Sequence, residues 1–123
     1  MIIGIGVDIL HLPRIAQLVS RRGSRPLARR ILSPRELQEF DTLPNKKDQV
    51  RYLGSRWCIK EAIYKALYPA HKLEWKQVWV TKEKGKPVLH VLNAQSLGIY
   101  RSHVSLSHDG EYAIAQVVLE GKD

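Results

Sequence analysis

The stretch KKDQVRYLGSRWCIKEAIYKALY, residues 46–68, decides the fold of this chain. It contains no proline, and Pro69 follows it directly. The pattern predicts one long helix, central to the fold, which the proline ends. Gly54 inside this helix costs about 1 kcal/mol relative to alanine, so we expect close packing at that point. The apolar residues recur at helical spacing: Val50, Leu53, Trp57, Ile59, Ala62, Ile63, Ala66 and Leu67.

The residues before this helix predict a strand and two shorter helices. Residues 2–8 are apolar and partly β-branched, which is typical of a buried strand, here ending at Asp8. A first helix follows, and Gly23 and Pro26 interrupt it. Residues 33–36, Ser-Pro-Arg-Glu, form a capping box that starts the second helix.

After the long helix, the period of the apolar residues changes to two. Residues 77–81 and 87–92 predict two strands joined by a turn. Asp109-Gly110 between two alternating runs predicts a hairpin, because these residues adopt the positive φ angles of a type I′ turn. The order of elements predicts a single α+β domain over residues 1–123, with a largely antiparallel sheet packed on the long helix.

Composition excludes several classes of protein. The chain has 123 residues, 44% of them apolar, one cysteine and no apolar run of membrane-spanning length. A single cysteine excludes an intramolecular disulfide and a zinc-type cysteine cluster. The amino terminus lacks the features of a signal or transit peptide, so we expect a reducing compartment, either the cytoplasm or the mitochondrial matrix.

The net charge of +8 is concentrated early in the chain. No acidic residue occurs between Leu10 and Arg35. A localised positive field of this kind attracts an acidic partner, which could be nucleic acid, an anionic membrane or an acidic protein. The segment contains seven arginines: Arg14, Arg21, Arg22, Arg25, Arg29, Arg30 and Arg35.

Two acidic residues stand out by position: Asp8 at the end of the predicted first strand, and Glu61 in the middle of the long helix. Convergent carboxylates suit Mg²⁺, a hard ion that substrate phosphates often complete. Periodicity alone favours a plainer interpretation, in which Glu61 pairs with Lys65 at i, i+4 and Asp8 caps a turn. Cys58 lies between apolar residues, which is typical of a packed thiol.

Five segments together resemble the holo-[acyl-carrier-protein] synthases, the small single-domain members of the phosphopantetheinyl transferase superfamily. They follow the family's order over nearly the whole chain, and their combination is specific. The segments are Gly4–Ile9, Arg29–Leu37, Arg56–Leu67, Gly85–Pro87 and Val104–Ala115.

The resemblance implies transfer of the phosphopantetheine arm of coenzyme A to a serine hydroxyl of an apo acyl carrier protein, with release of adenosine 3′,5′-bisphosphate. It implies that Asp8 and Glu61 bind Mg²⁺ and that Lys65 pairs with phosphate oxygens during transfer. Glu61, directly or through a metal-bound water, is the candidate acceptor of the serine proton. The sequence does not choose between a carrier of fatty-acid biosynthesis and one of polyketide synthesis.

The resemblance also implies which residues bind the donor. These residues, in addition to Lys65, are Arg56, Lys86, Pro87, Ser107 and His108. The chain departs from the family at residues 57–59, Trp-Cys-Ile, where smaller residues or phenylalanine are common. We expect this difference to alter the packing behind Glu61 without removing that carboxylate.

In the family, the early helix docks an acidic carrier protein. Arg14, Arg21 and Arg25 match that helix face best, and Arg22 and Arg29 are additional candidates. Charge complementarity affects encounter and orientation more than the chemical step. The resemblance further implies a homotrimer with active sites at the subunit interfaces.

Two other functions compete with this interpretation. A basic α+β module could bind RNA through its arginines, but the single phenylalanine and the lack of paired aromatic residues on the strands argue against it. A non-catalytic scaffold could share the fold, but the presence of both Asp8 and Glu61 argues against that function. We therefore expect an enzyme that binds no nucleic acid and does not insert into a membrane.

Overall fold

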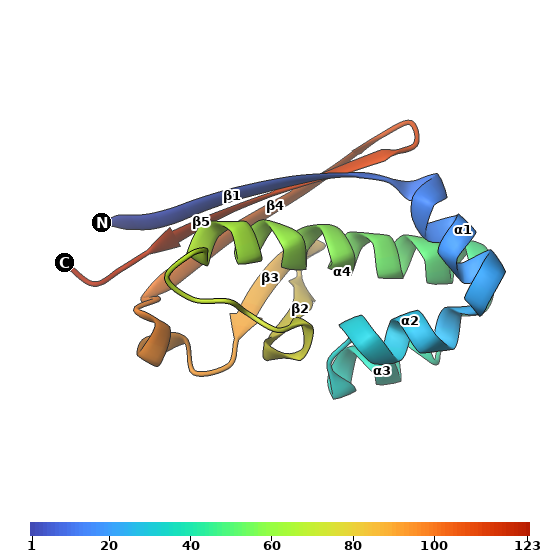
Figure 1. Ribbon diagram of the computed structural model, residues 1–123, viewed down its shortest axis with the longest axis horizontal. Helices are drawn as coiled ribbons and strands as arrows, with labels where there is room; N and C mark the ends of the chain where they lie inside the picture. The colour runs from blue at the N-terminus through green and yellow to red at the C-terminus, as the bar shows by residue number, and fades with distance from the viewer.

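The computed structural model describes residues 1–123 (Figure 1). The chain begins with a strand, continues through four helices and ends with four strands. Two short 3₁₀ helices, η1 (Trp75–Gln77) and η2 (Ala94–Leu97), lie between these later elements. The helices are α1 (Leu12–Arg22), α2 (Ser24–Ile31), α3 (Pro34–Phe40) and α4 (Lys46–Leu67). The strands are β1 (Ile2–His11), β2 (Val78–Glu83), β3 (Lys86–Val91), β4 (Arg101–Asp109) and β5 (Tyr112–Glu120).

Helix α4 is the centre of the fold, as the sequence predicts. The Asn45 side chain caps its first turn by accepting a hydrogen bond from the Asp48 N–H at 2.9 Å. The helix ends before Tyr68 and Pro69, one residue earlier than expected. It contacts β1 and β5 on one side and β2, α1 and α2 elsewhere, so it is covered by both halves of the chain (Figure 1).

The strands form two antiparallel sheets. The larger sheet has the order β1-β5-β4, and β2 pairs with β3 in the smaller one. A hairpin is present at Asp109-Gly110, as predicted, but Asp109 pairs with Tyr112, so the turn residues are Gly110 and Glu111. Only Gly110 has a positive φ, whereas the predicted type I′ turn needs two such residues. These pairings confirm the predicted α+β fold with an antiparallel sheet packed on the long helix. None of the helices has the length and apolar character needed to cross a membrane.

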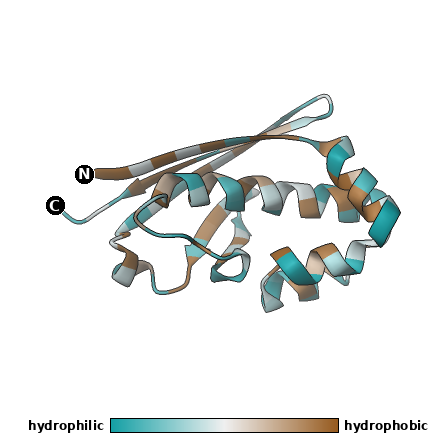
Figure 2. Ribbon diagram, viewed as in Figure 1, coloured by the Kyte–Doolittle hydropathy of each residue, from teal (hydrophilic) through white to brown (hydrophobic).

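Strand β1 differs from its prediction in length and in burial. Asp8 pairs with Ala115 inside the strand, and pairing continues to His11, so Asp8 neither ends the strand nor caps a turn. The strand is at the edge of its sheet, and only one of its faces lies on α4. Its other face is apolar and solvent-exposed. The apolar residues along β1 are coloured brown in Figure 2. Ile5 and Ile9 are 57% and 66% exposed.

Helix α2 is absent from the sequence prediction, which has Pro26 interrupting helical structure. Gly23, with a φ of 81°, does end α1, but a new helix begins at Ser24. Pro26 then lies in the first turn of α2, where a missing N–H costs no intrahelical hydrogen bond. The seven early arginines are therefore divided among α1, α2 and α3.

Helix α4 and strand β1 are in direct backbone contact. A Cβ atom placed on Gly4 would overlap the carbonyl oxygen of Ala66, and one on Gly6 would overlap that of Ala62. Gly54 also lies in a close contact, as predicted, but there the neighbour is the Leu12 side chain, 2.6 Å from the added Cβ. The contacts at Gly4 and Gly6 leave no room for adjustment, because the partner atoms belong to the backbone of α4.

Gly6→Ala is expected to lower the free energy of unfolding by about 3 kcal/mol or more, because the helix must move away from the strand. Gly54→Ala is the matched control and should change it by less than about 1 kcal/mol, since Leu12 can rotate and alanine favours helix. Urea unfolding followed by circular dichroism measures both. A Gly6→Ala midpoint equal to that of the unmodified chain would show that the contact is not tight.

Candidate active site

Asp8 and Lys65 form an ion pair between β1 and the last turn of α4. Asp8 Oδ1 is 3.0 Å from Lys65 Nζ, and the same ammonium donates a hydrogen bond to the Val7 carbonyl oxygen at 3.1 Å. The Asp8 side chain is 13% exposed and that of Lys65 is 51% exposed. Lys65 therefore pairs with Asp8, 57 residues away in sequence, and not with Glu61 as the plainer interpretation of the helix predicts.

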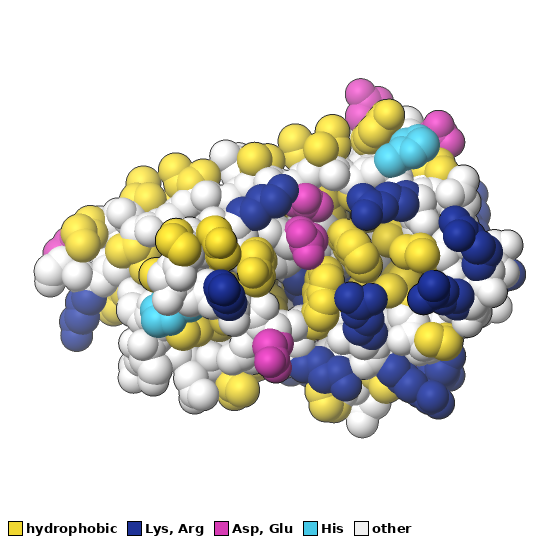
Figure 3. Space-filling model, in the orientation of Figure 1, with side chains coloured by type: hydrophobic (Ala, Val, Ile, Leu, Met, Phe, Trp, Pro, Cys, Tyr) yellow, Lys and Arg dark blue, Asp and Glu magenta, His cyan; other side chains and the backbone are white.

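Glu61 lies close enough to Asp8 for the charge of Asp8 to shift the pKa of Glu61. Partial burial raises the pKa of Glu61, and the negative charge of Asp8 raises it further. The positive charges of Lys65 and Arg14 act in the opposite direction. Two carboxylates and two cations, from β1, α1 and α4, thus share one region. In Figure 3, acidic side chains near the middle of the molecule are flanked by Lys and Arg.

The two carboxylates suit a hard divalent cation, because their oxygens are the ligands that Mg²⁺ prefers. The chain contains no group of three or more His, Cys, Asp and Glu side chains that could surround an ion. An ion at Asp8 and Glu61 would therefore keep open positions for water and for a phosphorylated substrate. The donor set fits the magnesium site that the resemblance implies.

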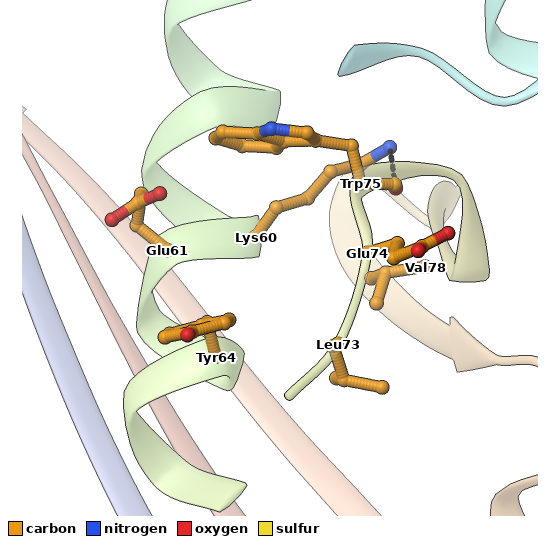
Figure 4. Close-up of a pocket in the computed structure, with 7 residues that line it drawn as sticks. All are labelled: Lys60, Glu61, Tyr64, Leu73, Glu74, Trp75 and Val78. Atoms are coloured by element: carbon orange, nitrogen blue, oxygen red, sulfur yellow. Dashed lines mark hydrogen bonds between the residues drawn. The ribbon is translucent and has the colours of Figure 1, made fainter. Parts of the chain in front are cut away.

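A small pocket of about 130 Å³ lies beside Glu61. Figure 4 shows Glu61 and Lys60, adjacent residues of α4, projecting in different directions. Lys60 crosses to the segment before β2, where it donates a hydrogen bond to the Trp75 carbonyl oxygen at 3.0 Å. The pocket thus lies between α4 and the segment that leads into β2, and each side contributes one glutamate, Glu61 or Glu74. Its lining residues are Lys60, Glu61, Tyr64, Leu73, Glu74, Trp75 and Val78.

Glu36 is a completely buried carboxylate on the far side of α4. The capping box predicted for Ser33 and Glu36 is present, with the Ser33 N–H donating to Glu36 Oε1 at 3.0 Å. Lys60 Nζ is 2.7 Å from the same oxygen, and the Val80 N–H donates to Oε2 at 3.0 Å. Burial lowers the pKa of Lys60, and the charge of Glu36 opposes that shift. The sequence predicts the cap but gives no sign of the buried ion pair.

Arg56 is held next to this cluster, with its guanidinium 3.8 Å above the centre of the Tyr52 ring. Its Nη1 donates a hydrogen bond to Ser55 Oγ at 3.1 Å, and its Nε lies 3.8 Å from Glu36 Oε2. The residue is only 7% exposed, and Nε is a buried donor with no hydrogen-bond partner. A buried cation with spare donors is suited to binding an anion.

Arg56 lines a cavity of about 400 Å³ between α4 and the two sheets. Pro87 and His108, two other predicted donor-binding residues, line the same cavity. Lys86 and Ser107 do not; Ser107 lies in a separate hollow with Ile9. Five polar residues that the sequence does not predict also line this cavity: Asp48, Arg51, Tyr52, Ser55 and Lys82. Only their positions in the folded chain distinguish them from ordinary surface residues.

The predicted carrier-binding arginines lie on α1 and α2. Arg14 and Arg21 are on α1, whereas Arg25 is in the first turn of α2. Arg25 forms an ion pair with Asp41 at 2.5 Å and lies over the Phe40 ring, so part of its charge is used within the chain. Lys and Arg side chains gather at the end of the molecule that carries these helices (Figure 3).

Cys58 packs behind the acidic pair, as the sequence predicts. It is fully buried, and its Sγ donates a hydrogen bond to the Asp8 carbonyl oxygen at 3.2 Å. Burial raises the pKa of the thiol to about 12, and the charge of Asp8 adds to this shift. Cys58 is therefore a packing residue and not a nucleophile.

Comparison with known proteins agrees with this geometry. Residues 4–117 match the family model of the 4′-phosphopantetheinyl transferase superfamily. The holo-[acyl-carrier-protein] synthase of Edwardsiella ictaluri is 41% identical, over 98% of both chains. The crystal structure of that synthase from Neisseria meningitidis superposes with a TM-score of 0.85 at 33% identity, covering 98% of this chain and 99% of that one. The Bacillus anthracis synthase, solved in complex with CoA (3′,5′-ADP), gives a TM-score of 0.79 at 30% identity, over 99% of both chains. The chain therefore belongs to the holo-[acyl-carrier-protein] synthases of the 4′-phosphopantetheinyl transferase superfamily.

Proposed function

We propose that this enzyme transfers the 4′-phosphopantetheine group of coenzyme A to a serine hydroxyl of an acidic apo acyl carrier protein and releases adenosine 3′,5′-bisphosphate. The observation that carries the proposal is the convergence of Asp8, Glu61 and Lys65 between β1 and α4. Two carboxylates beside a mobile ammonium provide what transfer of a phosphoryl group from a diphosphate requires: a metal site and a cation for the developing charge. An RNA-binding module has no need for this arrangement.

Asp8 and Glu61 would hold Mg²⁺, which supplies Lewis-acid polarisation of the donor's pyrophosphate when bound. Glu61 is the candidate to accept the serine proton. Its pKa is raised by burial and by Asp8, and a raised pKa makes a carboxylate a stronger base. Lys65 is half-exposed on a long side chain, so its ammonium can reach a phosphate oxygen next to the two carboxylates.

The nucleotide end of coenzyme A would occupy the cavity lined by Arg56, Pro87 and His108. Arg51 and Lys82 add positive charge there, which suits a phosphorylated nucleoside. Lys86 and Ser107 alternate with Pro87 and His108 along β3 and β4, so their side chains lie on the opposite face of each strand and not in this cavity. Arg56, which lines this cavity, would bind a phosphate oxygen through its guanidinium.

One chain does not bring both halves of this site together. Arg56 and Glu61 are five residues apart on α4, which corresponds to a rotation of about 140° around the helix axis. We infer that the donor binds across two copies in a homotrimer, with the acidic pair from one and the cavity from the next. The exposed apolar face of β1 and β5 supports an interface, because such patches are rarely left in water. This face includes Ile5, Val7, Ile9, Tyr112 and Ile114.

The activity can be tested by mass spectrometry of an apo carrier protein incubated with coenzyme A, Mg²⁺ and the enzyme. The carrier should gain the mass of the phosphopantetheine group. Asp8→Asn and Glu61→Gln should each reduce the rate at least about 100-fold, because each removes a charge needed in the transition state. Asp123→Asn, at the exposed carboxyl terminus, is the control for a lost carboxylate. No mass gain with any of several carriers would reject the function.

Arg21→Glu should raise the carrier KM about tenfold and leave the coenzyme A KM nearly unchanged, because it places like charge against an acidic partner. The effect should shrink as salt is added, since the contact is exposed. Lys122→Glu makes the same charge change near the carboxyl terminus and should leave the carrier KM unaltered. Equal effects of the two variants would contradict docking at α1.

Complementation tests the shared site. Glu61→Gln and Arg56→Met chains, co-expressed with different tags and purified through both, should regain transfer that neither variant has alone. Some interfaces in such mixed assemblies combine an intact acidic pair with an intact cavity. Co-expression of Glu61→Gln with Asp8→Asn damages the same half in both chains and should restore nothing. Recovery in neither case would place the whole site within one chain.

A further inference from the structure

The Asp8 carboxylate already has a close cation. Lys65 Nζ lies 3.0 Å from Asp8 Oδ1 and 3.1 Å from the Val7 carbonyl oxygen, so two oxygens of β1 bind one ammonium. Asp8 is largely shielded, at 13% side-chain exposure, which strengthens the attraction over that of a fully solvated pair. Helical spacing would allow Lys65 to pair with Glu61, four residues earlier on α4. Lys65 binds the strand instead.

The same carboxylate is the ligand that a divalent cation would need. A carboxylate oxygen binds Mg²⁺ at about 2.0–2.1 Å, and an ammonium on that carboxylate would then lie within a few ångströms of a doubly charged ion. Repulsion between the two cations would be strong in a partly buried site. Each cation therefore weakens the binding of the other, and Lys65 can move away readily because its flexible side chain is 51% exposed.

We propose that Lys65 and the divalent cation compete for Asp8, so that binding of the ion releases the Lys65 ammonium from β1. This inference rests on the metal site of the proposed function. It gives Lys65 two successive partners: Asp8 before the ion binds, and a phosphate oxygen of the donor afterwards. The cation would therefore bind before Lys65 becomes available to the donor.

Binding of Mn²⁺, measured by the loss of the free-ion signal in electron paramagnetic resonance, tests this competition without any turnover. Lys65→Met should bind Mn²⁺ about three- to tenfold more tightly than the unmodified enzyme, because its competitor is gone. Lys65→Arg retains a cation and should stay within about twofold. Arg14→Met is the matched control, since it removes a positive charge that acts on Glu61 without a contact to Asp8; it should tighten binding less than about twofold.

The outcomes separate this inference from the metal site itself. Unchanged or weaker binding by Lys65→Met, or equal tightening by Lys65→Met and Arg14→Met, would overturn the competition while leaving the site intact. Mn²⁺ binding that is unaffected by Glu61→Gln and Asp8→Asn would instead reject the metal site, and the competition with it. Thermal unfolding of each variant checks that the fold is retained.

Discussion

The contact on which the site depends is the direct packing of the α4 backbone against β1. Gly4 and Gly6 have no side chains, so the carbonyl oxygens of Ala66 and Ala62 come within reach of the strand. This close approach places Asp8 beside the helix turn that carries Glu61 and Lys65. A larger residue at either glycine would separate the strand from the helix and with it the two carboxylates. The proposed site therefore depends on two glycines that lie close to Asp8 in sequence and carry no side chain.

Two opposite sides of helix α4 carry different parts of the proposed site. One side faces β1 and carries Glu61 and Lys65; the other is fixed by the buried pair of Lys60 and Glu36 and holds Arg56 at the large cavity. Glu36 binds α3, α4 and β2 together, since it accepts hydrogen bonds from all three. A buried carboxylate with every oxygen paired is costly to disturb, so it keeps the helix from rotating. The separation of the two sides is the basis for the proposed binding of the donor across two copies of the chain.

The local features of the fold could be predicted well from the sequence. The long helix is correct to within one residue, because proline and apolar period act within a few residues of each other. The capping box at Ser33 and the location of the hairpin at Asp109 are correct for the same reason. Helix α2 was missed because Pro26 was interpreted as a break, although proline is well tolerated in a first turn. The predicted burial of β1 was wrong, since an apolar strand at a sheet edge has the same sequence whether or not a partner covers it.

By itself, the sequence determined the family and every helix and strand except α2, because these follow from local patterns and matched motifs. The tertiary structure alone decided which charges meet. It pairs Lys65 with Asp8 instead of Glu61, buries Glu36 against Lys60, and gathers Arg56, Pro87 and His108 around one cavity. The physical reason is that helical spacing makes the Glu61–Lys65 pair possible but worth only a few tenths of a kcal/mol. Packing of a distant strand against the helix therefore determines where the ammonium lies.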